Sequence, residues 1–549
     1  MIKIIKKYPL TSYILYRILN SFLLRTIFEP DEIWQNIEPI PYLFFNEGVL
    51  TWDWKTGIRT INAILPYLIP HFIFFKFFPT QYPKCGFYLT KVVSGILSGI
   101  CDYFVYKLGM SLKINADNLI FSTLFSHGLW LYAARSHINS LEMTSIAVIT
   151  YYLTKYNRNV YRNGSRLYLL IATIGIAYIS YCRPTSVFFI GVLCLENPLC
   201  LFLIVPLTVL IYSMLISIDC KIYGEFIIPP WNFAKLNLFY GMSDLFGKQP
   251  WYCYFIFITI LCGILPILII YNDIRLFFRR NKNKKDKVKF GPKSSGIRKP
   301  EKRITYVDKT SEVERTRINW VKMAMLVYFT AYMFIGHKEM RFLVPLIPFI
   351  NMYSSKHLTP FLKRVLAISL FVSFFIGLTH QNYINTLDFL HKKIQEQKLV
   401  HQELRNKSKS KIFSRKKEDN SEKLEDKKIR VLYCVCPYSL PAQSYFFDKN
   451  VIIDHIFAEP DIFSKKKDIK FYKKFGTNIL VNEFGKFIDK GFLDYEFDKY
   501  DFILCYDWIY DRIKNRLDMF KNIRAEKYCN LCLEAEKGKI IYILKKKNI

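Results

Sequence analysis

Two short charged segments in this sequence each border a long apolar run. The sequence His-Lys-Glu-Met-Arg-Phe at 337–342 joins two apolar stretches, and Pro-Asp-Glu at 30–32 follows the first apolar stretch of the chain. A charge at mid-bilayer costs about 2.5 to 3.5 kcal/mol on insertion scales, so ionisable residues at such positions usually face a polar site. The two segments therefore predict a binding or reaction site at the edge of a membrane.

The first segment offers a proton acceptor. Pro30 suits the first turn of a helix, which places Asp31 and Glu32 near the positive end of the helix dipole and favours their ionised forms. Side chains of adjacent helical residues diverge by about 100°, so one of the two aims into a site while the other pairs nearby. We favour Asp31 as the reactive carboxylate. The alternative, on spacing alone, is that both acids only cap a helix.

The second segment offers positive charge. His337, Lys338 and Arg341 supply hydrogen-bond donors suited to a phosphate, and an arginine can contact a phosphate through two parallel bonds. Glu339 is expected to orient Arg341. The alternative is that Lys338 and Arg341 are interfacial anchors that reach up to lipid headgroups.

The composition indicates a membrane protein. Hydrophobic residues make up 51% and aromatic residues 17% of 549 residues, and several apolar stretches reach the roughly 20 residues that a spanning helix needs. The net charge of +33 is carried by loops and by the C-terminal part, where Lys and Arg set topology, so nucleic-acid binding is not expected. The 13 cysteines are scattered, which argues against a disulfide framework.

The apolar stretches and basic loops predict a polytopic α-helical membrane protein with about 11 crossings. The N-terminus and the basic loop 272–318 are expected in the cytoplasm, and the loop 29–86 on the opposite side. Residues 59–79 contain Pro66 and Pro70, so we expect an interfacial or re-entrant segment there. The predicted spans are 8–28, 87–107, 117–134, 141–154, 167–182, 185–197, 199–217, 251–271, 319–336, 342–353 and 364–379.

Alternation along these spans gathers the polar segments of residues 1–390 on the non-cytoplasmic face, where they form a transmembrane catalytic domain. These segments are 30–32, 135–142, 183–185, 240–251 and 337–342. A charged linker at 391–430 then leads to a small soluble α/β domain at 431–549 on the same face. Its strand-like runs are 431–436, 451–456, 478–481, 501–506 and 539–544, and 512–523 fits a helix.

These residues also carry a resemblance to a known family. Over residues 20–390 the chain is similar to the dolichol-phosphate-mannose-dependent mannosyltransferases of the endoplasmic reticulum (ER). The matching segments are Phe-Glu-Pro-Asp-Glu-Ile-Trp-Gln at 28–35, Leu-Thr-Trp-Asp-Trp at 50–54 with Ile58 and Arg59, Arg-Ser-His-Ile-Asn-Ser-Leu-Glu at 135–142, Arg-Pro-Thr at 183–185, and 337–345. Segments within 219–255 resemble the branch that adds the third mannose of the glycosylphosphatidylinositol (GPI) core. The His-Pro-Trp-His-Trp-Tyr pattern of that branch is Gln-Pro-Trp-Tyr-Cys-Tyr at 249–254 here.

The resemblance implies an inverting mannosyltransferase of the ER membrane whose active site faces the lumen, with dolichol-phosphate-mannose as donor and a GPI precursor glycolipid as acceptor. Asp31 is then the base, with Glu32 beside it, because inversion needs one general base and a stabilised leaving phosphate. The donor phosphate would be held by His337, Lys338 and Arg341. No metal or other cofactor is implied, since a lipid phosphate leaves without the nucleotide diphosphate that usually recruits a metal.

The same resemblance suggests contacts to the acceptor or its sugars by Trp52, Trp54, Arg135, Arg183 and Trp251. Tryptophans also gather at membrane interfaces without any sugar. Other readings remain open: another member of the family, acting on the fourth GPI mannose or on N-glycans through α-1,2 or α-1,6 linkages, an inactive binding protein, or a lipid or ion transporter. Asp102, inside an apolar span, is the main feature that favours a transporter.

Overall fold

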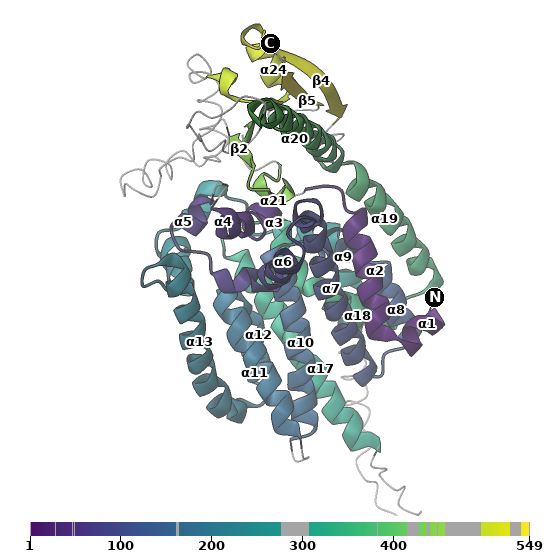
Figure 1. The fold of residues 1–549 in the computed structure, drawn as a ribbon. Helices are drawn as coiled ribbons and strands as arrows, with labels where there is room; N and C mark the ends of the chain where they lie inside the picture. Colours follow the sequence, from purple (N-terminus) through teal and green to yellow (C-terminus); the bar gives the residue numbers. More distant parts are fainter. Residues whose placement is uncertain are drawn as a thin grey trace, which may run out of the picture.

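The computed structural model describes residues 2–27, 29–46, 48, 50–160, 164–275, 307–380, 383–413, 428–435, 440–446, 448–455, 496–527 and 540–547. Helices dominate the molecule, and a small sheet lies beyond one end of the helical body (Figure 1). The predicted loop 272–318, linker 391–430 and strand run 478–481 fall partly or wholly outside the described residues.

The helical body follows the chain in order. Its α-helices are α1 (Ile2–Lys7), α2 (Pro9–Leu23), α3 (Asp31–Trp34), α4 (Pro39–Phe45), α5 (Trp52–Lys55), α6 (Leu65–Phe77), α7 (Tyr82–Ser111), α8 (Ala116–Leu124), α9 (His127–Tyr132), α10 (Ile138–Arg158), α11 (Ser165–Cys182), α12 (Val187–Cys194), α13 (Leu201–Tyr223), α14 (Pro229–Ala234), α15 (Cys253–Cys262), α17 (Val307–Met333), α18 (Ile347–Ser354), α19 (Pro360–Thr379) and α20 (Ile384–Phe413). A 3-10 helix, η6 (Met340–Leu346), carries Arg341. The short helices α3, α4 and α5 lie across the end of the body that faces the sheet (Figure 1).

Among the described residues, four helices are long and apolar enough to cross a membrane: Cys85–Ser111 within α7, α11, Pro198–Tyr223 around α13, and α19. A fifth candidate is α15 with the next helix, Leu265–Arg275, which meet at 102°. Each other predicted span also falls on a helix or a helix pair, but on one that is shorter or less apolar. The number of about 11 crossings therefore stays a prediction. The apolar helix Ile61–Phe77, with Pro70 inside it, is too short to count among these candidates.

Helices α2 and α7 pack unusually closely because two glycines of α7 face α2. A Cβ on Gly95 would lie 2.6 Å from the Cα of Ile18, and a Cβ on Gly99 would lie 2.5 Å from the Cα of Ile14. Small residues four positions apart let two helix backbones approach in a membrane. Any larger residue at either glycine would push the helices apart.

The same helix pair holds a buried ion pair. Arg17 on α2 and Asp102 on α7 are fully buried, and the Arg17 Nε lies 2.6 Å from the Asp102 Oδ2. Arg17 also donates to the Asn20 side chain and to the Leu129 carbonyl. The structure thus gives Asp102 a local partner, so this residue no longer favours a pathway for transported ions.

In the part of the C-terminal domain that the structure describes, the sheet has five strands in the order β2-β1-β3-β5-β4. They are β1 (Ile429–Cys434), β2 (Val451–His455), β3 (Phe502–Tyr506), β4 (Phe520–Lys527) and β5 (Ile540–Lys546), with β1 parallel to both β2 and β3 and β5 antiparallel to its neighbours. The helix predicted at 512–523 is wrong: α24 (Asp507–Ile513) ends early, and β4 pairs along β5 from Phe520. The first part of the predicted linker is helical, because α20 continues to Phe413.

The hydrophobic core has two parts. One lies among the membrane helices. The other joins residues of the sheet, such as Val431 and Phe502, to residues of the loop after α2, such as Ile33 and Trp34. The small domain therefore shares its core with the segment that carries Asp31.

The Arg17–Asp102 pair generates a stability prediction. Asp102→Asn leaves the Arg17 charge buried without its partner and should lower the free energy of unfolding by about 3–5 kcal/mol. The double variant Arg17→Met with Asp102→Leu should recover most of this loss. Thermal unfolding of the purified chain in detergent measures both effects. Asp117→Asn, which removes an exposed pair with Lys6, is the control and should cost about 1 kcal/mol or less. Equal losses in Asp102→Asn and Asp117→Asn would contradict the prediction.

Candidate active site

Arg341 joins the two charged segments that the sequence singles out. Its Nη2 lies 2.5 Å from the Asp31 Oδ2 and its Nε lies 3.0 Å from the Glu29 Oε2. The Nε also donates to the Glu339 carboxylate, two residues earlier in the chain. The Arg341 side chain is nearly buried, whereas Asp31 stays 26% exposed. One guanidinium thus meets three carboxyl groups, and two of them, Asp31 and the 25% exposed Glu339, remain partly open to a ligand.

The three carboxyl groups differ in their protonation. Burial raises the pKa of Glu29 to about 8 although Arg341 lowers it, so Glu29 holds a proton at neutral pH. Burial also raises the pKa of Asp31 above its usual value, against the lowering effect of Arg341. Burial acts in the same direction on Glu339, but Arg341 and His337 outweigh it and lower the pKa of Glu339 to about 2. A carboxylate with a raised pKa, such as Asp31, is the better proton acceptor near neutral pH.

His337 is placed to carry a positive charge. Its Nδ1 lies 3.0 Å from the carbonyl oxygen of Gly247, and its Nε2 lies 2.9 Å from the Glu339 Oε1. A carbonyl and an ionised carboxylate only accept hydrogen bonds, so both ring nitrogens donate. Burial lowers the pKa of His337, but the bonds to Glu339 and Gly247 raise it more. His337 therefore supports Glu339, which in turn orients Arg341.

Glu32 pairs with Arg135 and not with Arg341. Its Oε2 lies 2.6 Å from the Arg135 Nη1, and its backbone carbonyl accepts a bond of 2.5 Å from the Ser136 hydroxyl. Arg135 is 2% exposed and also donates to the carbonyls of Thr26 and Leu131. The Glu32–Arg135 pair thus fixes α3 to the loop before α10, away from any open space.

Lys338 does not point toward Asp31. Its ammonium donates to the carbonyl oxygens of Met333 and Ile335, at the C-terminal end of α17, and lies 5.4 Å from the Tyr254 ring centre. Lys338 is 3% exposed. The structure therefore makes Lys338 a helix cap, and of the three predicted phosphate contacts only Arg341 meets Asp31 directly.

Arg183 packs against the same Phe342 ring as Arg341. The guanidinium carbons of Arg183 and Arg341 lie 5.3 Å and 5.6 Å from the centre of that ring. Arg183 is also held by the buried Glu142, 3.5 Å from its Nε, and by the hydroxyl of Tyr332. These contacts link the predicted acceptor residue Arg183 to the Asp31–Arg341 cluster.

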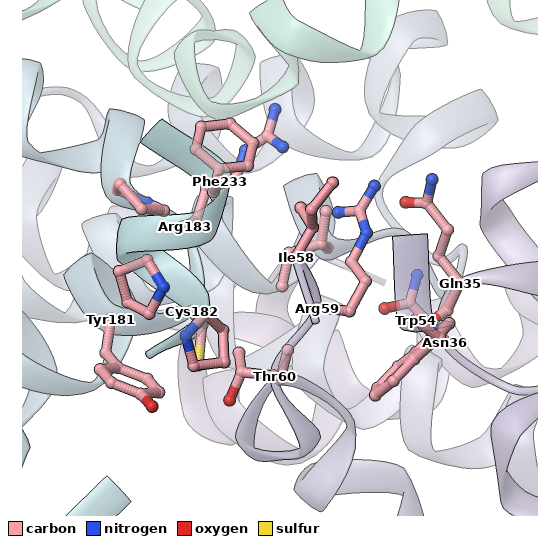
Figure 2. Close-up of a pocket in the computed structure, with 15 residues that line it drawn as sticks. Gln35, Asn36, Trp54, Ile58, Arg59, Thr60, Tyr181, Cys182, Arg183 and Phe233 are labelled. Atoms are coloured by element: carbon pink, nitrogen blue, oxygen red, sulfur yellow. The ribbon is translucent and has the colours of Figure 1, made fainter. Parts of the chain in front are cut away.

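A pocket of about 420 Å³, counting its open mouth, lies beside this cluster. Figure 2 shows the polar ends of Arg59, Arg183 and Gln35 directed toward the same side of it. The pocket lies next to α3, because its lining residue Asn36 donates from the side-chain amide to the Asp31 backbone carbonyl at 3.2 Å. It is lined by Gln35, Asn36, Trp54, Ile58, Arg59, Thr60, Ala63, Ile138, Tyr181, Cys182, Arg183, Pro184, Pro229, Pro230 and Phe233.

A buried carboxylate fixes one wall of the pocket. Asp219, near the end of α13, accepts hydrogen bonds from the Thr60 and Tyr181 hydroxyls at 2.7 Å and 2.6 Å. It also accepts from the backbone N–H of Ile61 at 2.8 Å and from the Asn62 side chain. Because so many donors converge on it, Asp219 holds the loop after Arg59 against α11.

The three predicted tryptophans have different surroundings. Trp54 is buried, lines the pocket and donates from its indole nitrogen to the Gln35 carbonyl. Trp52 is half-buried and does not line the pocket. Trp251 is 60% exposed, packs on the nearby rings of Tyr252 and Phe255, and is also outside the pocket lining. Of these three, Trp54 is the one placed to meet a ligand in the pocket.

Two residues of the site were missed at the sequence level. Glu29 precedes Pro30 and completes the acidic run, a signal that was available in the sequence. Arg59 pairs with Asp53 of the Trp-Asp-Trp segment at 2.6 Å. Its positive charge also lowers the pKa of Asp31, although its effect is smaller than those of burial, Arg341 and Glu339. Nothing in the spacing of Arg59 shows that it lies near Asp31.

The fold resembles one solved membrane protein over nearly its full length. ArnT from Cupriavidus metallidurans, solved bound to undecaprenyl phosphate, matches with a TM-score of 0.51 over 97% of each chain, at 10% identity. This likeness shows that the chain has the same overall fold as ArnT.

The chain belongs to the Alg9-like mannosyltransferase family, whose model matches residues 8–447. It is 26% identical over 362 residues to GPI mannosyltransferase 3 of Yarrowia lipolytica, covering 64% of this chain. It is 27% identical over 407 residues to human GPI alpha-1,2-mannosyltransferase 3, covering 70% of this chain. The matches span 62% and 64% of these two relatives, a little under two thirds of their lengths.

The doubly donating His337 generates a pH prediction. Because its pKa is raised in the fold, its stabilising effect is complete below its ordinary pKa of about 6.5 and is lost as the pH rises through the raised pKa. The loss of melting temperature caused by His337→Asn should therefore be larger at about pH 6 than at about pH 9. Scanning fluorimetry in detergent measures it.

His357→Asn is the control for this experiment. Burial lowers the pKa of His357, so the fold does not favour its charged form and the effect of His357→Asn should not grow toward acid pH. A His337→Asn effect that is the same at both pH values would contradict the charged state of His337.

Proposed function

We propose that this chain transfers mannose from dolichol-phosphate-mannose to a GPI precursor glycolipid and adds its third mannose in an α-1,2 linkage. The observation that carries this proposal is the contact of Asp31 with Arg341 beside an open pocket. Membership of the mannosyltransferase family and the names of the relatives support the reaction and the acceptor. The undecaprenyl phosphate bound by ArnT supports a polyprenyl-phosphate donor.

Asp31 is the general base in this proposal. An acceptor hydroxyl oxygen attacks the anomeric carbon of the donor mannose, and Asp31 takes the hydroxyl proton. The bond from that carbon to the phosphate oxygen breaks, and its electron pair leaves with the lipid phosphate. One displacement inverts the sugar without a covalent intermediate, so a single base suffices.

Arg341 stabilises the leaving phosphate. Its guanidinium now contacts carboxyl groups, and a phosphate that replaces Asp31 on the Nη2 would receive a charge-assisted bond. That exchange removes the partner that lowers the pKa of Asp31, so donor binding strengthens the base. In this proposal no metal or cofactor takes part.

The pocket beside Asp31 is the proposed acceptor site. Arg59 and Arg183 supply donors for hydroxyl or phosphate groups of a glycolipid, and Trp54 supplies an apolar ring face for a sugar. The proposed location is the ER membrane, with the site on the lumenal side. The basic loops predicted for the cytoplasm support this orientation, as do the contacts that join the polar segments 30–32, 183–185 and 337–342.

The first prediction from this proposal concerns Asp31. Purified wild-type chain supplied with dolichol-phosphate-mannose and a two-mannose GPI precursor should add a third mannose. Asp31→Asn should lower kcat by about 10²–10⁴-fold, because an amide cannot accept the hydroxyl proton. Mass spectrometry of the lipid product measures the transfer. Asp273→Asn, which alters an exposed pair with Lys322, is the control and should keep wild-type activity. Near-normal transfer by folded Asp31→Asn protein would remove Asp31 as the base.

The second prediction concerns Arg341. Arg341→Lys keeps the charge but loses the forked donor geometry, so the KM for the donor should rise by about tenfold or more while the KM for the acceptor changes little. Steady-state kinetics with each substrate varied in turn separates the two constants. Arg524→Lys, at a surface pair with Glu526, is the matched control. Equal rises in both KM values would argue against a phosphate contact.

A further inference from the structure

The helix that carries Asp31 cannot hold itself in place. α3 is only 4 residues long, and so short a helix has little stability of its own. Arg341 and Arg135 hold it through Asp31 and Glu32. A second set of contacts to the same loop comes from residues 440–446, more than 400 positions later in the chain.

Trp34 makes the first of these contacts. It is the last residue of α3 and is 2% exposed. Its indole N–H donates to the Leu440 carbonyl at 3.1 Å, and its ring meets the His455 ring edge-on at 5.1 Å between centres. Trp34 therefore ties α3 to the end of β2 and to the segment before α21 (Gln443–Phe446).

Glu38 makes the second contact. It is 1% exposed, and its carboxylate accepts hydrogen bonds from the backbone N–H groups of Ala442, Gln443 and Ser444 at 3.3 Å, 2.6 Å and 3.2 Å. Buried backbone N–H groups are costly to leave unpaired, so one carboxylate satisfies three groups of another domain. The loop of Asp31 and the start of α21 are thereby held as one unit.

Residues 440–446 are themselves anchored on their far side. The Gln443 side chain donates to the carbonyls of Asp448 and Val451 at 2.8 Å and 2.7 Å. The Tyr445 hydroxyl donates to Asp388 on α20, and its ring packs on Phe87 of α7 at 4.8 Å. The segment thus connects the sheet and two long helices to the loop of Asp31.

We propose that Glu38 and Trp34 are positioning residues through which the C-terminal domain sets the place of Asp31. This inference rests on the proposed function, because it concerns the base of that reaction. Neither side chain lines the pocket or pairs with Arg341, and both lie on the same segment as Asp31. Trp34 comes three positions after Asp31, and Glu38 comes seven positions after it. A shift of about 1 Å in a reacting group can cost a hundredfold in rate, so the hold on this loop acts on kcat.

Two variants test the inference in the full-length chain. Glu38→Gln replaces one of the two accepting carboxylate oxygens with an NH2 group, which donates and cannot accept N–H bonds. Trp34→Phe removes the indole N–H while keeping a ring in the core. Both should lower kcat by about tenfold or more with little change in the KM for the donor, because Arg341, the proposed contact of the donor phosphate, lies outside the loosened segment. Glu526→Gln, in β4 of the same domain, is the matched control for the charge change and should leave kcat as it is.

Hydrogen exchange of the same proteins gives a readout that does not depend on activity. The amides of residues 31–38 should exchange faster in both variants than in wild type, and those of α10 should not change. A general loss of structure would instead speed exchange throughout the chain and would lower kcat together with the melting temperature, which overturns the positioning role.

The outcomes separate the two proposals. If wild-type chain adds no mannose, the proposed function fails, and exchange at 31–38 still decides whether the C-terminal domain holds the loop. If wild type is active and both variants keep its kcat, or if exchange at 31–38 is unchanged, the positioning role is overturned while the proposed function stands. If Glu38→Gln fails to fold, Trp34→Phe still provides the kcat and exchange measurements, since the phenyl ring preserves most of the packing.

Discussion

The meeting of Arg341 with Glu29, Asp31 and Glu339 is the interaction on which the rest of this site depends. Removing a charged group from water costs several kcal/mol, so a nearly buried guanidinium is stable only if its partners compensate it. Those partners come from segments about 300 positions apart, and the pairing therefore fixes α3 against η6. Burial keeps Glu29 protonated and His337 supports Glu339, so the cluster tolerates three carboxyl groups around one cation.

Charges at a membrane edge serve the backbone as well as the substrate. Lys338 caps the carbonyls at the end of α17, and Lys91 donates to the carbonyls of Ser21 and Leu24 at the end of α2. Arg135 donates to two more carbonyls beside its bond with Glu32. Helix ends with little access to water need such donors, so a cation next to an apolar run is a weaker sign of a binding site than its cost suggests.

The helices and the meeting of the two charged segments could be predicted from the sequence, because the length of each apolar stretch and the position of each basic loop can be read directly from it. The choice of partners could not. Spacing does not show that Asp31 pairs with Arg341 while Glu32 pairs with Arg135, or that Glu38 meets residues 442–444, since each pair joins distant parts of the chain. Residues 512–523 were misread as a helix because the apolar spacing of this stretch suits one, whereas pairing with β5 makes a strand from Phe520.

Asp31 must leave Arg341 and must also stay in place as the base, which explains why its segment is held both by Arg341 and by other contacts. If the proposed reaction is correct, the donor phosphate must displace Asp31 from Arg341, and that exchange removes one of the bonds that keep the short α3 in place. The bonds of Trp34 and Glu38 to residues 440–444, and that of Glu32 to Arg135, do not involve Arg341 and persist through the exchange. Asp31 can then turn from the guanidinium to the acceptor hydroxyl while its backbone stays fixed. A base that must release one partner to act needs a support that is independent of that partner.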